Sequence, residues 1–298
     1  MPRSLRIGLA AASTVGAGAL FLVVAHPGRL AASLRALPPS AVLAAAGATM
    51  AGVMLGAVRW RSLLAAAGVH APTPRLFATL TIGAAVNNLV PARGGDAVRV
   101  ESAHQLTGAP RLAVAGTMVS ERVLDGLVLA LLVVAGAAGA SVGGVFLWVG
   151  IGVAGGLVLV AVALARVSHP RLGAGVAVFR APKVAAATLA VTAGIWLADV
   201  VMYAALAHGF GLDVSLATML LLVGAGNLAL AVPGAAAGLG SFELVTLAGA
   251  HGIGLGGPEL AAFVLAIHAV IVLPPTVTGL LLARVALPKG FRLRYAES

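Results

Sequence analysis

Three ionisable residues, Glu121, Arg122 and Asp125, stand near the middle of a long apolar segment. A charge at the centre of a bilayer costs about 2.5–3.5 kcal/mol on insertion scales, so such residues need partners. On a helix the three side chains fall within an arc of about 100°, and we expect this polar face to look into a helix bundle. Two roles are open: a structural ion pair between Arg122 and one acid, and a polar path whose groups exchange protons or partners during transport. The second acid leaves the structural role incomplete, because one arginine cannot fully neutralise two carboxylates.

The stretch NNLVPARGGDAVRVES, residues 87–102, interrupts an apolar segment with Pro91 and a glycine pair. A helix that stops inside the membrane leaves backbone N–H groups free, and glycines let a ligand approach that backbone closely. Asp96 is predicted to be the N-cap of the next helix, and Arg93 stands at the positive end of its dipole, which suits a phosphate group. The alternative is that Arg93 and Asp96 simply pair at the membrane face. The candidate substrate-binding residues here are Arg93, Gly94, Gly95, Asp96 and Arg99.

A second broken segment also combines a glycine-rich loop with the start of a half-helix, but it carries fewer charges. Ser241 follows a glycine-rich loop and can cap the half-helix that carries Glu243, although Glu243 is also typical of an ordinary helix start. Asp199 lies within another apolar segment and indicates function, whereas His268 is more typical of a hydrogen-bonded packing residue. We assign Gly238, Gly240 and Ser241 to substrate binding, and Asn88, Asp199, Glu243 and His268, with the triplet above, to a polar path or ion-pair network.

The elements that must position these residues are membrane helices. The chain of 298 residues is 60% hydrophobic and 9% charged, with a mean hydropathy of +1.07, which excludes a soluble domain with a polar surface. Since spanning takes about 20 apolar residues, the fold class is all-α, a polytopic helical bundle forming one membrane domain over residues 1–298. Full crossings are predicted at 5–25, 40–58, 112–139, 144–165, 184–208 and 259–283, and re-entrant hairpins, each made of two half-helices, at 76–106 and 214–252.

The basic residues set the orientation. The formal net charge is +10, yet these residues stand singly or in pairs at the ends of apolar runs, so we expect no nucleic acid partner. With Arg59 and Arg99 among the cytoplasmic residues, only Arg29 and Arg35 fall outside, which predicts cytoplasmic termini in a cell membrane protein. A secretory signal before residue 25 is the alternative at the N-terminus. The chain has no cysteine and no metal-binding histidine spacing, so neither metal nor cofactor is expected.

The two broken segments resemble each other. FATLTIGAAVNNLVPARGGD and LATMLLLVGAGNLALAVPGAAAGLGSFE share an Ala-Thr start, an asparagine, a proline, a glycine loop and an acid, with Asn88 set against Asn227. Because the two hairpins enter from opposite faces in this topology, the pattern indicates an inverted repeat. Chance similarity between two Ala/Gly-rich stretches is the alternative.

Four stretches carry a family resemblance: NNLVPARGGDAVRV, ERVLDGLVL, VPGAAAGLGSFE and LPPTVTGLLL. In order and spacing the chain resembles the lysylphosphatidylglycerol synthase transmembrane family, also called flippase-like domain proteins. Asp96 stands where glutamate is usual, Ala236 where proline is usual, and His268 where tyrosine or arginine is usual. The resemblance implies characteristic positions at Asn88, Pro91, Arg93, Gly95, Asp96, Arg99, Glu121, Arg122, Asp125, Gly238, Gly240 and Glu243.

The resemblance implies a domain that moves lipids between leaflets, in some members fused to a soluble transferase domain. Only a short tail follows the last predicted helix, so we expect no synthase activity and no enzyme. The expected function is translocation of an anionic or phosphate-bearing lipid, by alternating access if the repeat holds. The alternative is a non-transporting lipid-binding or scaffold subunit of a lipid-modifying system. Expected partners are the lipid itself, a second copy of the chain, or a lipid-synthesis enzyme.

Overall fold

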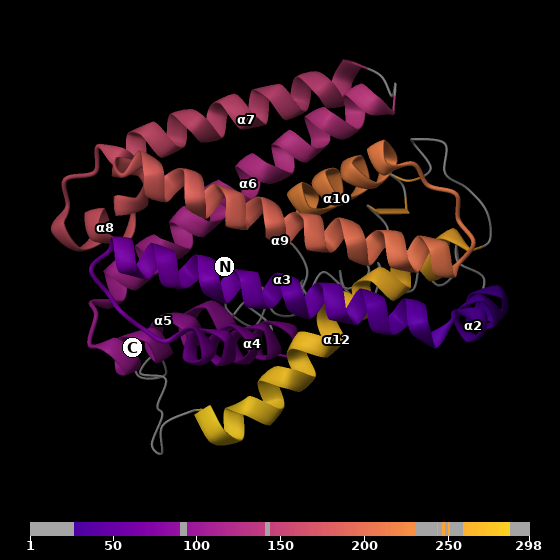
Figure 1. The fold of residues 1–298 in the computed structure, drawn as a ribbon, viewed down its shortest axis with the longest axis horizontal. Coiled ribbons are helices and arrows are strands. Elements are labelled where there is room, and N and C mark those ends of the chain that lie inside the picture. The colour runs from indigo at the N-terminus through magenta and orange to yellow at the C-terminus, as the bar shows by residue number, and fades with distance from the viewer. Residues whose placement is uncertain are drawn as a thin grey trace, which may run out of the picture. The chain divides into compact units, whose positions relative to one another are not determined.

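The computed structural model describes residues 27–89, 94–140, 144–230, 243, 246–247, 250 and 259–286, and the regular elements within them are helices (Figure 1). The all-α prediction is therefore confirmed. In chain order the elements are α2 (Pro27–Ala36), α3 (Pro39–Ala66), α4 (Thr73–Leu89), α5 (Gly94–Thr107), α6 (Arg111–Gly139), α7 (Gly144–Ala165), α8 (Pro170–Gly175), the 3-10 helix η1 (Ala177–Arg180), α9 (Pro182–Gly209), α10 (Leu216–Leu230) and α12 (Leu260–Ala286).

Five helices among the described residues are long and apolar enough to cross a membrane: α3, α6, α7, α9 and α12. They match five of the six predicted crossings, and the sixth, at 5–25, lies outside the described residues. One boundary was wrong, because α3 continues to Ala66 rather than ending at residue 58. The chain is thus a polytopic helical membrane protein.

Helix α7 shows why these helices need lipid. Its mean hydropathy is 2.5, yet only 6% of its most apolar window is buried. Leu159 is 71% exposed and Trp148 is 70% exposed. A continuous apolar surface of this kind is stable against acyl chains and not against water.

The chain divides into two compact units, which are described separately. The first unit comprises Met1–Thr49, Leu129–Gly152 and Trp196–Leu273, and the second comprises Met50–Val128, Val153–Ile195 and Pro274–Ser298. The second unit holds α4 and α5, and the first holds α10, so each unit contains one of the predicted broken segments. The single domain over 1–298 and the internal repeat stay predictions.

In the first unit, three aromatic side chains pack together in a largely aliphatic core. Tyr203 and Phe210 each meet Phe263 edge to face, with ring centroids 6.1 and 6.3 Å apart. Helices α6 and α10 approach so closely that a β-carbon at Gly136 or Gly224 would collide with the facing backbone. Small residues thus let two apolar helices pack without the hydrophobic effect that drives packing in water.

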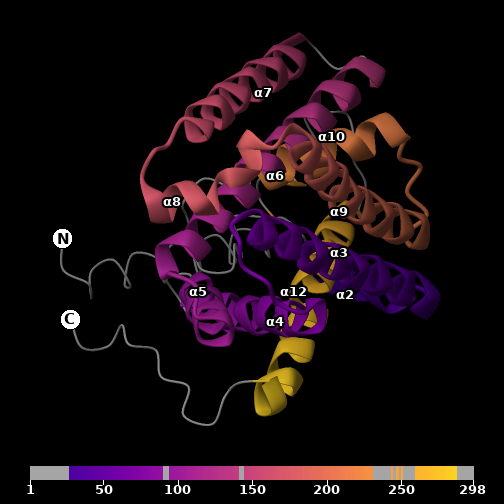
Figure 2. The same cartoon turned by 60° about the vertical axis from the view of Figure 1, so that its left-hand side comes forward.

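In the second unit, α4 and α5 pack against each other as a hairpin (Figures 1 and 2). With 17 and 14 residues they are about 26 and 21 Å long at 1.5 Å per residue, short of the roughly 30 Å hydrocarbon core. The break predicted within 76–106 is therefore present. The connecting residues 90–93, with Pro91, lie outside the described part of the chain.

Helix α10 forms the first half of the other broken segment and has 15 residues. Most of the second half, including Gly238, Gly240 and Ser241, lies outside the described residues. Three short elements were not predicted: α2, α8 and η1. Their sequences are too short or too polar to carry a hydropathy signal.

Candidate functional site

Four charged side chains from three helices of the second unit form a buried cluster. Arg59 of α3 contacts Asp125 of α6 through both guanidinium ends, with Nη1 donating to Oδ1 and Nη2 donating to Oδ2 at 3.3 Å. The same Nη2 lies 3.9 Å from Glu121 Oε1. Arg99 of α5 donates from Nη2 to Glu121 Oε2 at 2.8 Å. Glu121 therefore lies between two arginines.

Burial makes this cluster energetically demanding. Glu121 is 3% exposed, and Arg59 and Arg99 are each 7% exposed. Two arginines balance two carboxylates, so the formal charge of the four side chains is zero. Such a group is tolerated only while each charge keeps its partner, because an unpaired buried charge costs several kcal/mol. Within the cluster itself, the buried Nε groups of Arg59 and Arg99 have no hydrogen-bond partner among the described residues.

Trp60 fixes the position of Arg99. The guanidinium carbon of Arg99 lies 4.5 Å from the centroid of the buried Trp60 ring, a cation–π contact. The indole Nε1 donates to Thr117 Oγ1 of α6 at 3.0 Å, which fixes the ring. On the other side of the cluster, Arg59 Nη1 lies 3.5 Å from Thr192 Oγ1 of α9. Two adjacent residues of α3 therefore contribute to the cluster. Arg59 supplies one of its two arginines, and Trp60 supplies the ring that contacts the other, Arg99.

The structure corrects the predicted triplet. Arg122 does not neutralise the buried acids, because its side chain is 63% exposed and lies 4.0 Å from Asp96. Helix geometry explains the split: four residues advance a helix by about 40°, so Glu121 and Asp125 share a face, whereas one residue turns Arg122 by about 100°. The buried acids take their arginines from other helices instead.

Arg59 was missed because it was assigned to a cytoplasmic helix end. Helix α3 continues to Ala66, about two turns further, and this places Arg59 inside the unit. Arg99, counted as cytoplasmic as well, is also buried. A signal for Arg59 existed in the sequence, since two acids on one membrane face require two cations and Arg122 stands off that face.

The glycine pair serves helix packing. A β-carbon at Gly95 would fall on the carbonyl oxygen of Gly83 in α4 and on the Asn87 side chain. The Gly95 N–H, predicted to be free for a ligand, donates to Asn87 Oδ1 at 2.8 Å. At Gly94 the added atom would meet only Val86, at an ordinary 3.5 Å. The expectation that Gly95 admits a ligand is wrong at this position, because the facing helix already fills the space.

Asp96 is not the N-cap, since α5 begins at Gly94 and Asp96 lies in its first turn. Its Oδ1 lies 3.5 Å from Asn87 Nδ2. Asn87 was not predicted as a site residue, yet its side chain connects the end of α4 to the start of α5 through contacts with both Gly95 and Asp96. The neighbouring Asn88 donates to Thr276 Oγ1 of α12 at 2.8 Å. Arg93 lies outside the described residues.

A second ion pair connects α5 to the first residue of α6. Arg111 donates to both carboxylate oxygens of Glu101, at 2.7 and 3.0 Å. The hydrogen bond from Arg111 lowers the pKa of Glu101 to about 2, helped by Gln105. Because Glu101 belongs to α5 and Arg111 to α6, the pair fixes the short helix to a membrane-spanning one.

In the first unit the structure brings Glu243 and His268 together. His268 Nδ1 lies 2.6 Å from Glu243 Oε1, and both side chains are buried. His268 is thus buried and hydrogen-bonded, as the sequence indicated, and its partner is the acid Glu243. Asp199 lies partly buried on α9 one turn from Tyr203, whose buried hydroxyl has no partner among the described residues.

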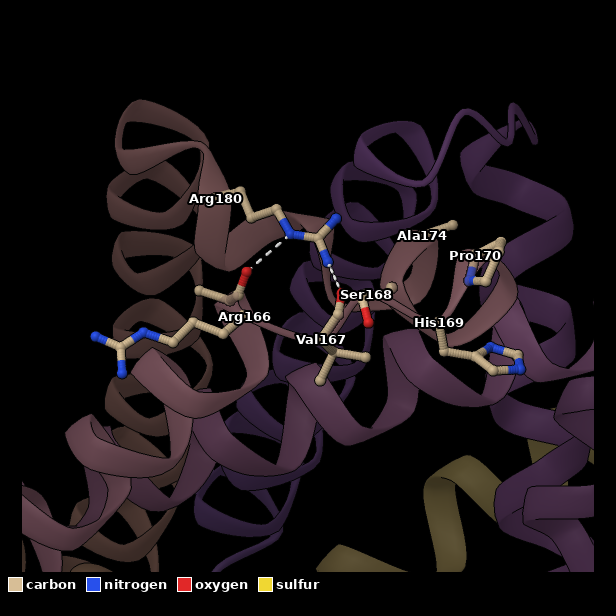
Figure 3. A pocket seen from close by; sticks show the side chains of 9 residues that line it. Arg166, Val167, Ser168, His169, Pro170, Ala174 and Arg180 are labelled. Carbon is tan, nitrogen blue, oxygen red and sulfur yellow. Dashed lines mark hydrogen bonds between the residues drawn. The ribbon is translucent and has the colours of Figure 1, made fainter.

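The α7–α9 connection forms a basic pocket at the surface (Figure 3). Arg180 donates from Nε to the Ala165 carbonyl at 2.9 Å and from Nη2 to the Val167 carbonyl. Gly173 leaves room for this guanidinium. Arg180 therefore holds the connection together, while Arg166 and His169 are exposed.

A family model described as Lysylphosphatidylglycerol synthase TM region matches residues 7–279. No curated protein matches the chain.

Proposed function

The chain belongs to the lysylphosphatidylglycerol synthase TM region family, a family of membrane lipid proteins, and we propose that it is a lipid translocase. Its substrate is an anionic or phosphate-bearing lipid that moves between leaflets. The head group follows a polar path inside the protein while the acyl chains stay in lipid. We assign it no chemical step of its own.

The observation that carries this proposal is the neutral cluster of Arg59, Arg99, Glu121 and Asp125. Three spanning or broken helices contribute four charged side chains to it, of which Arg59, Arg99 and Glu121 are buried, although apolar residues would pack at lower cost. Arginine is also the side chain best suited to a phosphate, because its planar fork binds two oxygens at once. A buried, balanced and arginine-rich cluster fits a path for an anionic head group.

The short hairpin supports the same proposal. Arg99 lies on α5, which does not span the membrane, whereas Arg59 lies on the spanning helix α3. Broken helices carry substrate sites in many transporters, because non-helical backbone at membrane depth lines polar cavities. Arg99 is thus placed on the type of element that such sites use.

The test is lipid movement by the purified protein. Vesicles of phosphatidylcholine would carry a trace of fluorescent phosphatidylglycerol, and dithionite added outside would bleach only outer-leaflet probe. We expect the protein to make the inner probe accessible, and the matched Arg99→Gln protein to do so more slowly. Fluorescent glucosylceramide, which lacks phosphate, serves as the control lipid.

Absence of any acceleration for fluorescent phosphatidylglycerol, phosphatidate and phosphatidylethanolamine would contradict a translocase. A lipid-binding or scaffold subunit would then be the better description, with a lipid-synthesis enzyme or a second copy of the chain as partner. Co-purified lipids identified by native mass spectrometry would name the ligand in either case.

We further propose that the protein lies in the cell membrane with both termini cytoplasmic. Arg59 and Arg99 no longer count toward this orientation, because both are buried. The exposed Arg75, Arg166 and Arg171 keep the same bias toward one side.

A further inference from the structure

Glu121 is held unequally by its two arginines. Arg99 Nη2 donates to it at 2.8 Å, whereas Arg59 Nη2 is 3.9 Å away. Arg59 is committed to Asp125 through two contacts. Arg99 has Glu121 as its acidic partner and retains an unfilled, buried Nε. Arg99 is therefore the arginine that can change partners with the smaller loss.

A carboxylate and a phosphate are alternative ligands for one guanidinium. Both present oxygens spaced to accept from the planar fork, and both are negatively charged. Glu121 thus occupies the position on Arg99 that a phosphate would take. The Arg99 side chain is 9% exposed, so its unfilled donor faces the interior of the unit rather than water.

Removing Arg99 from Glu121 would not leave this acid alone. Arg59 lies within reach and already faces both carboxylates of α6. The charged groups around Glu121 are Arg99 of α5, Arg59 of α3, and Arg122 and Asp125 of its own helix. With Arg59 as a second counterion, the exchange avoids the large penalty of an unpaired buried charge.

We propose that Glu121 is an internal competitor for the substrate's phosphate. Arg99 exchanges the Glu121 carboxylate for a phosphate group, and Arg59 keeps Glu121 paired meanwhile. Trp60 is a positioning residue, because its ring holds the Arg99 guanidinium in either state. The inference rests on the proposed function for the substrate class and deepens it by assigning opposite effects to Arg99 and Glu121.

The experiment measures binding of two probes to the full chain in detergent micelles by calorimetry: dihexanoyl phosphatidylglycerol and inorganic phosphate. Glu121→Gln frees Arg99, and we expect about 10- to 100-fold tighter binding of at least one probe, the range for a hydrogen bond to a charged group. Arg99→Gln is expected to abolish this gain. Tightening with inorganic phosphate as well would mean that phosphate alone is recognised, and tightening with the lipid only would mean that acyl chains contribute.

Glu101→Gln is the control, because it removes a buried carboxylate from the same unit but leaves the Arg99–Glu121 pair and its second counterion Arg59 intact. It is expected not to tighten binding. Should Glu121→Gln fail to fold, Glu121→Asp draws the carboxylate back from Arg99 and should also tighten binding, by a smaller factor.

Equal or weaker binding of both probes by folded Glu121 variants would overturn the competitor role, and so would a gain in Glu101→Gln as large as that in Glu121→Gln. Failure of this inference is distinguishable from failure of the proposed function. Tighter binding without any lipid movement in vesicles would uphold the exchange and contradict the translocase. Lipid movement without tighter binding would support the translocase and contradict the exchange.

Discussion

Replacing Arg59 with glutamine tests whether the buried acids depend on α3. The change removes two contacts from Asp125 and the second cation from Glu121, both on the buried side of α6. Breaking a buried ion pair by removing one partner costs about 3–5 kcal/mol. The matched change Arg122→Gln removes the same charge from an exposed side chain 4.0 Å from its acid, which costs about 1 kcal/mol or less.

The measured quantity is the free energy of unfolding in mixed micelles. Unfolding is induced by titration with dodecyl sulfate and monitored by tryptophan fluorescence. Arg59→Gln combined with Asp125→Asn should recover part of the loss, because the second change removes the orphaned charge. Equal losses for the Arg59 and Arg122 variants, or no recovery in the double variant, would refute the arrangement. In the structural role that the sequence left open, Arg122 was the partner of one acid, and its removal would then be the costly change.

Three further changes test the second unit. Gly95→Ala should lower the free energy of unfolding by about 2–4 kcal/mol through overpacking and loss of the Asn87 contact, whereas Gly94→Ala should leave it nearly unchanged, measured in the same titration. Cysteines at the exposed positions Arg75 and Pro110 should react with an impermeant maleimide from the same side, and labelling from opposite sides would exclude a re-entrant hairpin. Trp60→Phe keeps a ring against the guanidinium but loses the Thr117 hydrogen bond, so stability should fall by about 1 kcal/mol.

The spanning helices could be predicted because the bilayer imposes a strict requirement. About 20 consecutive apolar residues are needed, and α6, α7 and α9 begin and end within two residues of the predicted bounds. The break between α4 and α5 was predictable for a related reason, since proline and glycine end a helix. The α2 helix escaped prediction because its ten residues are too few and too polar for a hydropathy signal.

The site was only half predictable. Charge cost alone indicated that Glu121 and Asp125 need buried partners. It could not identify Arg59, because a partner from another helix is a tertiary fact and an arginine near the end of an apolar run is typical of a membrane flank. The angular spacing of residues on a helix could have shown that Arg122 lies off the face shared by Glu121 and Asp125, since one residue turns the helix by about 100°.

The glycine pair shows a different kind of error. The two glycines correctly indicate that another group approaches the backbone closely, but they do not indicate whether that group is a ligand or a neighbouring helix. At Gly95 the approaching group is the carbonyl of Gly83, and the free N–H is taken by Asn87. A glycine that admits a ligand and a glycine that admits a helix have the same sequence signature.

Neutrality of the cluster has a consequence for how a translocase would bind its lipid. A site with excess positive charge holds an anion tightly and releases it slowly, whereas conduction requires binding that is favourable enough to enter and weak enough to leave. When Arg99 must give up Glu121 to take a phosphate, the binding free energy is a difference between two similar contacts, not the full strength of either. In the proposed exchange Arg59, 3.9 Å from Glu121, would accept the released carboxylate and so keep that difference small. On the proposed exchange, Glu121 would keep the affinity of the cluster for phosphate low, and low affinity is the property that a carrier of lipid head groups needs.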